Sequence, residues 1–292
     1  MPLLVTYLTG GCNDDDSAAA TEHNHNHSSD SVPSSLPPMD AAAFDASLDV
    51  PERMMGITQL RRQLAAEAQG DVLEVAVGTG RNLGYYSWDS SKQDPHVTSF
   101  TGVDLSADAL TVARRRLRSS VPGAKAVIRK RPLPQEPTAA AADAVPIKDL
   151  PVAVLDVLDS RLRLLRADAM QPLPLPSSSS PAYDTVVQTF GLCSVADPVA
   201  LLAHMAAVLR PDTGRILLLE HGRGRWSVVN SLLDRYASRH FSRFGCWWNR
   251  DIDAILANAA TAVPGLEVVA VSRPGWFQFG TLWWVELRVN AA

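Results

Sequence analysis

The sequence contains 292 residues, of which 46% are hydrophobic and 20% are charged, and its formal net charge is −4. This length and composition are typical of a globular protein that forms one large domain or two small ones. A nucleic-acid-binding domain requires a basic face or stripe, and the overall charge gives no support for one. The sequence therefore offers no indication of a nucleic-acid partner.

The three cysteines, Cys12, Cys193 and Cys246, are scattered along the chain and form no C-x-x-C pair. Their spacing predicts neither a zinc site nor a disulfide framework, and a reducing compartment is the expected environment. We therefore expect no bound metal at these residues. The apolar start, residues 1–11, lacks a basic region and is too short to span a bilayer. We expect no targeting or membrane segment in the sequence as written.

Residues 12–50 are dominated by Asp, Ser, Ala, Asn and Pro, and we expect residues 1–50 to form a disordered low-complexity tail. The tail contains the alternating histidines of "HNHNH", residues 23–27. These histidines suit either a metal site or a polar low-complexity tract. We favour the tract, because no second group of ligands stands nearby in the sequence.

The predicted elements begin near residue 51 with an amphipathic helix, whose apolar residues recur at helical spacing: Met54, Ile57, Leu60 and Leu64. A strand over 71–77 follows, and a second strand covers 97–104. Ser106 is then a suitable N-cap for a helix that runs to about Leu117. This order of elements predicts two strands linked by helical or turn segments at the start of the domain.

A segment rich in proline and alanine, residues 119–151, comes next and is expected to be a surface insertion. The strand after it, 161–168, alternates arginine with leucine, which suits the edge of a sheet because charges discourage unwanted pairing. Beyond this edge strand the sequence predicts a fourth strand at 183–190, a helix that ends before Pro211, and a fifth strand at 214–221.

A helical stripe follows the fifth strand and is expected to pack on the core: Val229, Leu232, Leu233, Tyr236 and His240. The chain closes with two strand-like runs within 266–289, joined through Pro274 and Gly275. Because parallel strands need a long crossover, this short connection predicts an antiparallel hairpin. The alternation of strands and helices before the hairpin predicts a mostly parallel sheet covered by helices.

The first strand runs directly into a turn that contains Gly78 and Gly80. A dinucleotide-binding turn needs a third glycine where Leu83 stands, and a phosphate-binding loop needs Gly-Lys-Ser/Thr where Arg81 and Asn82 follow. Both phosphate-binding interpretations are therefore weakened. The turn still lies at the carboxyl end of a strand, where open α/β sheets bind their ligands.

Acidic residues end the second and third strands. Asp104 is placed to accept hydrogen bonds from both hydroxyls of a ribose, and Asp168 is placed to accept the amino hydrogen of an adenine. Ala169 and Met170 follow Asp168 and would lie against the base. Together with the glycine turn, these residues predict a site for a nucleoside.

Five segments, in this order, carry a resemblance to class I S-adenosylmethionine-dependent methyltransferases: "VLEVAVGTGRN", "FTGVDLS", "RADAMQPLP", "YDTVVQTFGLCSV" and "LRPDTGRILLLEHG". The resemblance covers roughly residues 51–290. It implies an α/β, Rossmann-like fold with a seven-stranded, mostly parallel sheet, a C-terminal antiparallel hairpin and helices on both faces. It also implies S-adenosylmethionine as the cofactor.

The resemblance assigns cofactor-binding roles to residues at these motifs: Glu74, Ala76, Gly78, Gly80, Asp104, Leu105, Asp168, Ala169, Met170, Gln188, Thr189 and Phe190. Glu74 would steady the turn, near the methionine part of the cofactor. Gln188, Thr189 and Phe190 would line the methyl-donor side. Ala76 stands where the family usually has its first glycine, a replacement that many relatives tolerate.

Four shorter segments resemble one branch of this family: "MMGITQLRRQL", "QTFGLCSVADP", "LLLEHGRGRW" and "GCWWNRDID". That branch comprises fungal and protist mitochondrial methyltransferase-like proteins linked to suppression of cytochrome oxidase assembly defects. More distantly, the segments resemble alkyl thiol methyltransferases and ubiquinone-pathway C-methyltransferases. The resemblance implies a small apolar acceptor such as a quinone precursor, lipid or thiol. It also implies a mitochondrial location, with a cytoplasmic location as the alternative, and peripheral association with a membrane.

Candidates for the acceptor side lie after the fourth strand. His221 is the candidate general base, and its alternative is a histidine that holds a neighbouring loop by a hydrogen bond. An aromatic lid or membrane-facing patch would use Phe244, Trp247, Trp248, Asn249, Arg250 and Trp276. Its alternative is core packing, with Arg250 paired to Asp251. Cys193 is expected to be a small buried residue rather than a nucleophile.

A rival function from another class is a non-catalytic mitochondrial assembly factor that uses the methyltransferase fold as a scaffold. The intact set of cofactor motifs favours the enzyme. Cofactor binding without turnover on any acceptor would favour the scaffold.

Overall fold

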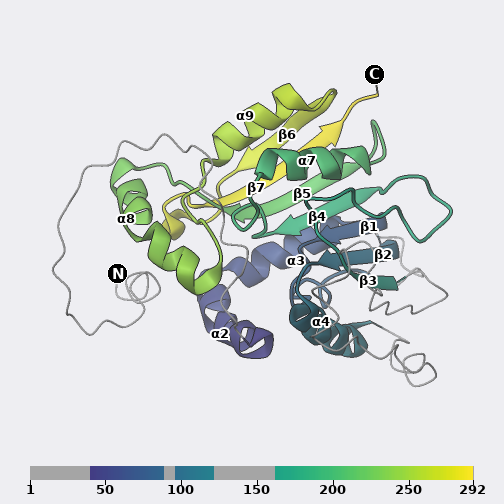
Figure 1. Cartoon of the computed structure of the whole chain (residues 1–292), viewed down its shortest axis with the longest axis horizontal. Coiled ribbons are helices and arrows are strands. Elements are labelled where there is room, and N and C mark those ends of the chain that lie inside the picture. Colours follow the sequence, from purple (N-terminus) through teal and green to yellow (C-terminus); the bar gives the residue numbers. More distant parts are fainter. Residues whose placement is uncertain (1–39, 89–95, 122–161, 292) are drawn as a thin grey trace, which may run out of the picture.

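A computed structural model describes residues 40–88, 96–121 and 162–291 of the chain. These residues form a seven-stranded sheet in the order β3-β2-β1-β4-β5-β7-β6. The strands are β1 Gly70–Val75, β2 Val97–Asp104, β3 Leu162–Arg166, β4 Thr185–Thr189, β5 Arg215–His221, β6 Leu266–Ser272 and β7 Leu282–Val289. Figure 1 shows them as one twisted sheet through the middle of the molecule.

The first five strands pair in parallel, and β7 pairs antiparallel with both β5 and β6. The expected C-terminal hairpin is therefore confirmed, as is the mostly parallel sheet. β3 lies at one edge of the sheet, where its alternating arginines placed it. All five parallel strands direct their carboxyl ends to the same edge, which gathers the segments that follow them.

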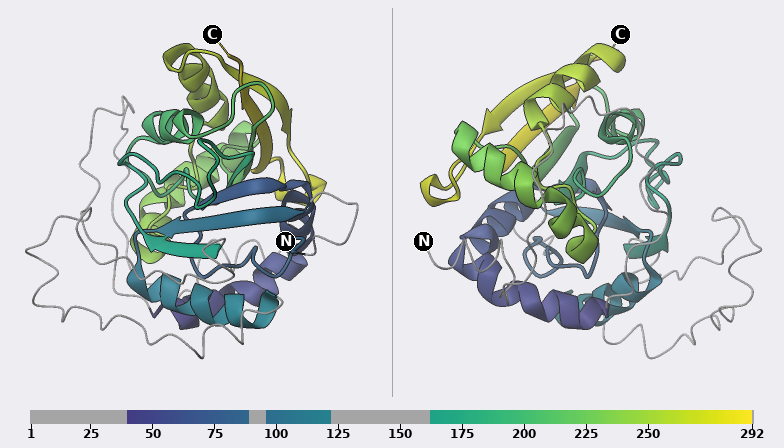
Figure 2. Two further views of the ribbon diagram at one scale, coloured as in Figure 1. Left: turned by 90° about the vertical axis from the view of Figure 1, so that its right-hand side faces the viewer. Right: turned by 60° about the vertical axis from the view of Figure 1, so that its left-hand side comes forward.

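Helices cover both faces of the sheet (Figures 1 and 2). They are α2 Ala41–Met54, α3 Ile57–Glu67, α4 Ala107–Ser120, α7 Pro198–Ala207, α8 Ser227–Phe244 and α9 Ile252–Ala262, with a short 3₁₀ helix η2 at Trp276–Gln278. Leu64 of α3 and Leu117 of α4 belong to the core on one face. Leu201 of α7 and Ile255 of α9 belong to the core on the other. The fold predicted from the sequence, with helices on both faces, is confirmed.

The helical structure begins ten residues earlier than the sequence predicts, because residues 41–50 form most of α2 and do not belong to a disordered tail. Asp40 caps this helix by accepting a hydrogen bond from the backbone N–H of Ala42 at 2.9 Å. The buried residues of α2 are Asp45 and Glu52, so its buried face is acidic and gives no hydrophobic periodicity. Gly56, with a φ of +71°, separates α2 from α3 where the sequence predicted one helix.

Several expectations lie outside the described residues. They concern residues 1–39, which include the histidines of residues 23–27, and most of the insertion at 119–151, of which 119–121 complete α4 and its cap. Ser106 caps α4 as predicted and accepts a hydrogen bond from the backbone N–H of Ala109 at 3.2 Å. Among the described helices, none has the length and apolar character needed to cross a bilayer.

Candidate functional site

The glycine turn at the end of β1 combines left-handed backbone angles with open space at one of its glycines. The φ angle is +55° at Gly78 and +76° at Gly80, a region that glycine enters without steric cost. A Cβ on Gly80 would lie 2.5 Å from the Leu83 side chain and 3.2 Å from Ala113 of α4. The nearest described atom to a Cβ on Gly78 is the Ala76 carbonyl oxygen, at 3.9 Å. Gly80 therefore allows the turn to pack on α4, and Gly78 leaves the backbone open to a ligand.

Ala76 occupies the position where the resembled family carries its first glycine, and its φ of +53° is left-handed. A residue with a Cβ destabilises this conformation by about 1–2 kcal/mol relative to glycine. The turn keeps the left-handed form in spite of this strain. The backbone path at Ala76 is therefore imposed by the surrounding fold rather than by the residue that occupies it.

Asp104 joins the end of β2 to the glycine turn. Its Oδ2 accepts a hydrogen bond from the backbone N–H of Gly78 at 2.8 Å, and its Oδ1 accepts one from the N–H of Ser106 at 2.8 Å. Burial raises the pKa of Asp104, and these backbone hydrogen bonds oppose the shift. Because a carboxylate offers about four acceptor sites, two remain for the hydroxyls of a ribose. Leu105 follows with 50% of its side chain exposed, beside the expected nucleoside.

Glu74 supports the turn from beneath and does not face an open space. Its carboxylate is buried and accepts hydrogen bonds from Asn82 Nδ2 at 2.9 Å and from the Tyr86 hydroxyl at 2.8 Å. Burial raises the pKa of Glu74 to about 7, against the opposing effect of these hydrogen bonds. Asn82 and Tyr86 lie beyond the glycines, so Glu74 holds the returning chain against β1, which agrees with its predicted role.

The loop after β3 presents Asp168 and the two residues expected beside a base. Asp168 Oδ1 accepts a hydrogen bond from the backbone N–H of Met170 at 2.9 Å, which leaves the second carboxylate oxygen available to a ligand. Ala169 and Met170 are partly buried and pack against the core. The Ala169 carbonyl also contacts His204 Nδ1 at 3.0 Å. The loop is therefore anchored at both ends while Asp168 remains partly exposed.

The segment that follows β4 carries unusual features for a packed strand end. The Gln188 side chain is fully buried, yet neither its amide nitrogen nor its oxygen has a partner among the described residues. Thr189 Oγ1 accepts a hydrogen bond from Arg61 Nη1 at 2.7 Å. Phe190 is left-handed, with a φ of +57°, which is a strained conformation for a bulky residue. Strain and unpaired polar atoms of this kind gather at functional sites.

Glu220, the penultimate residue of β5, fixes the same segment. Its Oε1 accepts hydrogen bonds from the backbone N–H groups of Gly191 at 2.9 Å and Leu192 at 3.2 Å. The side chain is fully buried, and its Oε2 has no partner among the described residues. Burial raises the pKa of Glu220 to about 8, although the two backbone hydrogen bonds oppose the shift.

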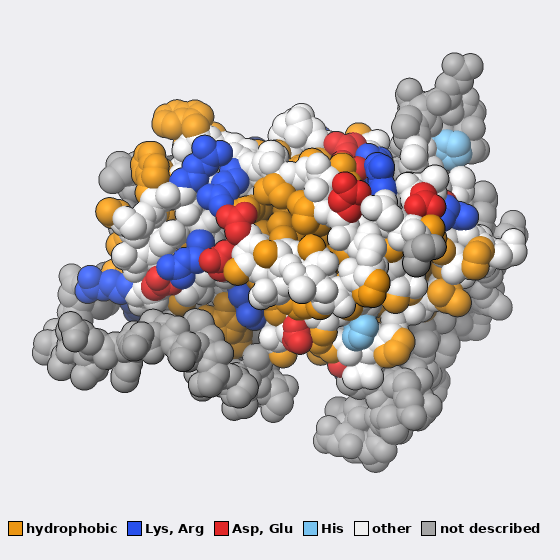
Figure 3. All heavy atoms as spheres, turned by 90° about the horizontal axis from the view of Figure 1, so that it is seen from above, with side chains coloured by type: hydrophobic (Ala, Val, Ile, Leu, Met, Phe, Trp, Pro, Cys, Tyr) orange, Lys and Arg blue, Asp and Glu red, His pale blue; other side chains and the backbone are white. Residues whose placement is uncertain are grey.

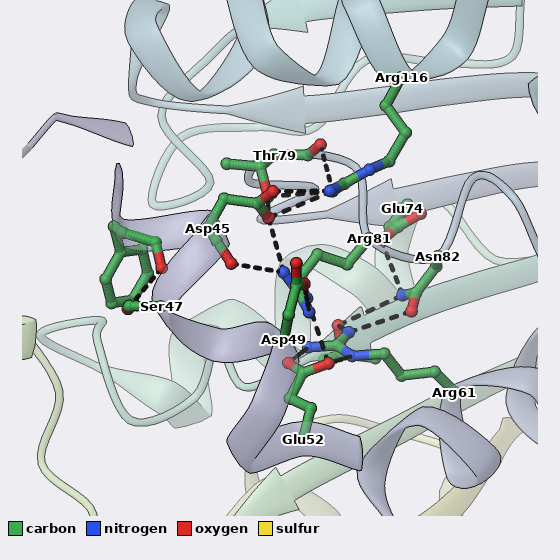
Figure 4. Close-up of polar contacts among 12 residues, drawn as sticks. Asp45, Ser47, Asp49, Glu52, Arg61, Glu74, Thr79, Arg81, Asn82 and Arg116 are labelled. Atoms are coloured by element: carbon green, nitrogen blue, oxygen red, sulfur yellow. Dashed lines mark hydrogen bonds and ion pairs between the residues drawn. The ribbon is translucent and has the colours of Figure 1, made fainter. Parts of the chain in front are cut away.

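Helix α2 covers the glycine turn through a network of ion pairs that sequence reasoning missed (Figure 4). Asp45 accepts hydrogen bonds from Thr79 Oγ1 at 2.5 Å, Arg81 Nη1 at 2.8 Å and Arg116 Nη2 at 2.6 Å. Burial raises the pKa of Asp45, but the hydrogen bonds from Arg116, Thr79 and Arg81 outweigh it and lower the pKa overall. Asp49 also pairs with Arg81 at 2.9 Å. The turn is thus held from outside by an acidic helix face.

Arg61 of α3 extends this network to the end of β4. Its guanidinium pairs with Glu52 at 2.9 Å and donates to Asn82 Oδ1 at 3.0 Å and to Thr189. It also lies over the Phe190 ring, 5.1 Å from the centroid. Arg61 therefore links α2, the glycine turn and residues 188–190, called the donor-side segment below. Its role was not predicted, because Asn82 and Thr189 lie 21 and 128 residues away along the chain.

His221, the candidate base, contacts a thiol instead of an open acceptor position. Its Nε2 lies 2.9 Å from Cys246 Sγ, and its Nδ1 is buried without a partner among the described residues. Burial lowers the pKa of His221 to about 4. A base with this pKa is a poor proton acceptor at neutral pH, so the structure does not support the predicted role of general base. Cys193 is buried, as expected, but it lies beside His221 and Cys246.

The aromatic segment after α8 agrees with core packing at Trp248. This side chain is 5% exposed, stacks on His240 with centroids 3.9 Å apart and donates from Nε1 to the Leu233 carbonyl at 2.9 Å. Trp247 is partly buried and stacks on Phe241 at 4.4 Å. Trp248 is therefore no lid residue, and it stabilises the end of α8.

The other proposed acceptor-side residues have separate surroundings. Phe244 is partly buried, with its ring centroid 4.6 Å from that of His240. Asn249 donates to Asp234 at 2.9 Å, and Arg250 donates to the Val195 carbonyl at 2.7 Å. The expected pairing of Arg250 with Asp251 is wrong, because Asp251 caps α9 through a 3.0 Å hydrogen bond from the backbone N–H of Ala254.

Trp276 is not packed over the core as a lid residue would be, since it is 88% exposed. It lies in η2, in the connection between β6 and β7, and meets Phe277 edge to face with centroids 6.0 Å apart. Of the two roles expected for Trp276, an aromatic lid and a membrane-facing patch, its exposure is compatible with the patch.

The residues at the carboxyl edge of the sheet fit a nucleoside cofactor with an amino-acid tail. Gly78 leaves open backbone, Asp104 and Asp168 keep acceptor capacity at neighbouring strand ends, and Gln188 holds two unpaired polar atoms. The edge has no Gly-Lys-Ser/Thr loop, and Leu83 is fully buried in the core where a dinucleotide-binding turn has glycine. The arrangement therefore suits a nucleoside without phosphates.

Comparison with known proteins agrees with this geometry. The profile of the family described as "Methyltransferase domain" matches residues 49–268. Over 249 residues the chain is 32% identical to the mitochondrial methyltransferase OMS1 of Saccharomyces cerevisiae. This match covers 85% of the chain and 44% of the yeast protein, so the chain spans less than half of that relative. A phosphatidylethanolamine N-methyltransferase of Cereibacter sphaeroides is 27% identical over 228 residues, which are 75% of the chain and 84% of that protein.

Solved structures share the fold at low sequence identity. An O-methyltransferase family protein from Burkholderia thailandensis has a TM-score of 0.55 and 14% identity, over 86% of this chain and 60% of that one. A dimethyltransferase of aminodemethylriboflavin, RosA from Streptomyces davawensis, has a TM-score of 0.50 and 16% identity, over 85% of this chain and 58% of that one. The chain therefore belongs to the methyltransferase domain family.

Proposed function

We propose that this protein methylates a small apolar acceptor, such as a quinone precursor, a lipid or a thiol, at a mitochondrial membrane surface. The observation that carries the proposal is a group of exposed apolar side chains on the described surface. It comprises Met54, Trp226, Val228, Trp276 and Phe277, and is called the apolar surface cluster below. Their exposed fractions are 54%, 60%, 71%, 88% and 43%, in that order.

The apolar surface cluster lies near the sheet edge that carries the cofactor residues. His221 at the end of β5 pairs with Leu282 at the start of β7, so η2 lies just beyond the carboxyl end of β5. Gln278 of η2 donates a hydrogen bond to the Met55 carbonyl, which ties η2 to the end of α2. The Trp226 ring, at the start of α8, lies 5.6 Å from that of Phe279.

Exposed tryptophans of this kind favour a membrane interface. Tryptophan has a large apolar ring with one N–H donor, and it is enriched where lipid meets water. Figure 3 shows hydrophobic side chains projecting at the upper left of the molecule, beside a group of arginine side chains. Such a surface suits the headgroup region of a bilayer, where an apolar acceptor is concentrated.

The names of relatives support the same class of acceptor. One relative is named a phosphatidylethanolamine N-methyltransferase. Another is the ubiquinone/menaquinone biosynthesis C-methyltransferase UbiE of Shewanella piezotolerans, which is 29% identical over 84 residues, 29% of this chain and 32% of that protein. The yeast relative is named as mitochondrial. These names support a membrane-borne acceptor and a mitochondrial location.

Bound S-adenosylmethionine supplies a methyl group on a positively charged sulfur. Methyl transfer is an in-line displacement, in which alignment contributes most of the catalysis. Asp104 would hold the ribose, Asp168 would orient the base, and Gln188 through Phe190 would line the donor side. His221 has a lowered pKa and faces a thiol, so it would not remove a proton from the acceptor. The protein would instead promote methyl transfer by positioning the reactants and excluding water.

The test is methyl transfer from deuterium-labelled S-adenosylmethionine to three acceptors in phosphatidylcholine vesicles: a demethylated quinone, phosphatidylethanolamine and a long-chain alkyl thiol. Mass spectrometry of the lipid extract should find label on one of them, and Asp104→Ala should lower its incorporation when S-adenosylmethionine is limiting. Cofactor binding without label on any of the three acceptors would contradict the proposal and favour the non-catalytic assembly factor. Label on a water-soluble acceptor alone would overturn the membrane part.

A further inference from the structure

Three residues far apart in the sequence bring their ligand atoms together behind the donor-side segment. Cys193 lies in the turn after β4, His221 ends β5, and Cys246 follows the C-cap of α8. The two sulfurs and one imidazole nitrogen all lie within 4.8 Å of one another. We propose that Cys193, His221 and Cys246 bind a zinc ion.

The fold holds this cluster in place through its backbone. Gly245 is left-handed, with a φ of +67°, and its N–H donates to the Phe241 carbonyl, which ends α8 and turns the chain. The N–H of Trp247 then donates to the Cys193 carbonyl at 2.9 Å. This bond fixes the two cysteine-bearing loops side by side, and parallel pairing of β4 with β5 brings His221 to the same edge.

The donor set is the one that zinc prefers. Cysteine sulfur and histidine nitrogen are the usual zinc ligands, at about 2.3 Å and about 2.0–2.1 Å from the metal. Three donors around one ion at these distances lie a little under 4 Å apart by geometry, so atoms that already fall within 4.8 Å of one another need only small side-chain adjustments. Carboxylate oxygens would instead favour magnesium or calcium, and none belongs to this cluster in the described part of the chain.

The surroundings favour a metal over a hydrogen-bonded pair of thiols. Cys193 and Cys246 are 1% and 6% exposed, and the imidazole makes its polar contact with Cys246 alone, since Nδ1 has no partner among the described residues. The Arg250 guanidinium interacts electrostatically with both cysteines, and its Nε has no hydrogen-bond partner in the described part of the chain. A guanidinium at this place stabilises the negative charge that zinc-bound sulfurs carry.

The site has three protein ligands, which leaves one position of a tetrahedral ion for water or another ligand. It also borders the donor-side segment. Cys193 Sγ lies 3.5 Å from the Phe190 carbonyl oxygen, and the His221 ring lies 5.3 Å from the Phe190 ring. A zinc ion there would fix the conformation of this strained segment.

Cobalt titration of the metal-free, reduced, untagged full chain tests the site. Tetrahedral cobalt bound by cysteine gives sulfur-to-metal charge-transfer absorption in the near ultraviolet, whereas the imidazole-rich segment at residues 23–27 gives none. We expect this absorption to saturate at one cobalt per chain and to disappear when zinc is added. Cys246→Ser and Cys193→Ser should abolish it, His221→Asn should weaken it, and Cys12→Ser is the matched control that keeps it.

Two results would overturn the inference. One is a folded wild-type chain, judged by circular dichroism and by S-adenosylmethionine binding, that gives no charge-transfer absorption with cobalt. The other is an absorption that survives in both Cys193→Ser and Cys246→Ser. Should the serine variants fail to fold, the wild-type titration alone decides. Mass spectrometry under non-reducing conditions shows whether the two cysteines instead form a disulfide in a chain that binds no cobalt.

Discussion

The Asp104 carboxylate accepts a 2.8 Å hydrogen bond from the backbone N–H of Gly78. This contact joins the acid at the end of β2 to the open glycine of the turn after β1. A change at Asp104 therefore affects a ligand in two ways. It removes an acceptor for the ribose, and it releases the turn on which that ligand lies.

Asp104→Ala should lower the affinity for S-adenosylmethionine by at least about tenfold, which corresponds to about 1.4 kcal/mol. The loss follows from the missing ribose acceptor and from the freed Gly78. Calorimetric titration with S-adenosylmethionine measures it. Asp108→Ala is the matched control, because Asp108 is an exposed acid in the first turn of α4 and should leave the affinity unchanged. Equal affinities for wild type and Asp104→Ala would show that Asp104 does not bind the cofactor.

Ala76→Gly should stabilise the protein by about 1 kcal/mol, because glycine relieves the strain of the left-handed backbone. Urea denaturation measures the free energy of unfolding. Ala257→Gly, an identical change at an exposed position within α9, should instead destabilise by about 1 kcal/mol. A loss of stability in both variants would mean that Ala76 is not strained.

Stability should fall as pH rises, because burial raises the pKa of Glu220 to about 8 from its ordinary value of 4.5. Between these values the unfolded chain has released the Glu220 proton while the folded chain still holds it. The folded state therefore binds more protons, and its stability is lost as pH rises through this window. The buried Glu74, with a pKa raised to about 7, acts in the same direction.

Glu220→Gln should flatten this dependence by an amount on the order of a few kcal/mol. The amide oxygen can still accept the hydrogen bonds from Gly191 and Leu192, but the side chain no longer ionises. Urea denaturation at several pH values between the two pKa values gives the slope. Glu267→Gln, at an exposed position of β6, should keep the wild-type slope. The prediction fails if Glu220→Gln and wild type show parallel curves.

Trp248→Ala should destabilise the protein by about 3–5 kcal/mol, since it removes a buried aromatic ring from the core. Trp276→Ala should change the free energy of unfolding by less than about 0.5 kcal/mol, because its ring is exposed. Thermal and urea denaturation distinguish the two. Similar losses for both residues would contradict the different positions assigned to them.

Trp226→Ser together with Trp276→Ser should reduce flotation with vesicles of phosphatidylcholine and phosphatidylglycerol, and should leave the affinity for S-adenosylmethionine unchanged. The physical reason is the loss of two rings that would enter the headgroup region. Trp247→Ser, whose ring stacks on Phe241 within the protein, is the comparison variant. Flotation that persists in the double variant would exclude the apolar surface cluster as the membrane contact.

The sequence predicted the parallel sheet and its C-terminal hairpin well, because both follow from local rules. The strand patterns that lead to Asp104 and Asp168 predict strand ends there, and β2 ends at Asp104 and β3 at Arg166. Parallel strands place those ends together. The C-terminal hairpin followed from its short connection. These features need only neighbouring residues, and the structure confirms their arrangement.

Features that depend on partners far apart along the chain could not be predicted from the sequence. The acidic face of α2 can be interpreted only once its partners are known: Asp45 pairs with Arg81 and Arg116, which lie 36 and 71 residues away. His221 and Cys246 are 25 residues apart, a spacing that matches no metal motif. The low pKa of His221 also arises from burial, which its place at a strand end did not reveal.

Helix α2 bears on how a working fragment of this protein should be cut. The family match begins at residue 49, inside α2, so a fragment trimmed to that boundary discards Asp45 while keeping both of its arginine partners. Such a fragment would carry every recognisable motif and yet leave Arg116 without the carboxylate it meets in the folded chain. We expect it to be recovered aggregated or without cofactor. If such a fragment showed no methyl transfer, the cause would be the loss of Asp45 at the chosen boundary, and the result would say nothing about the activity of the full chain.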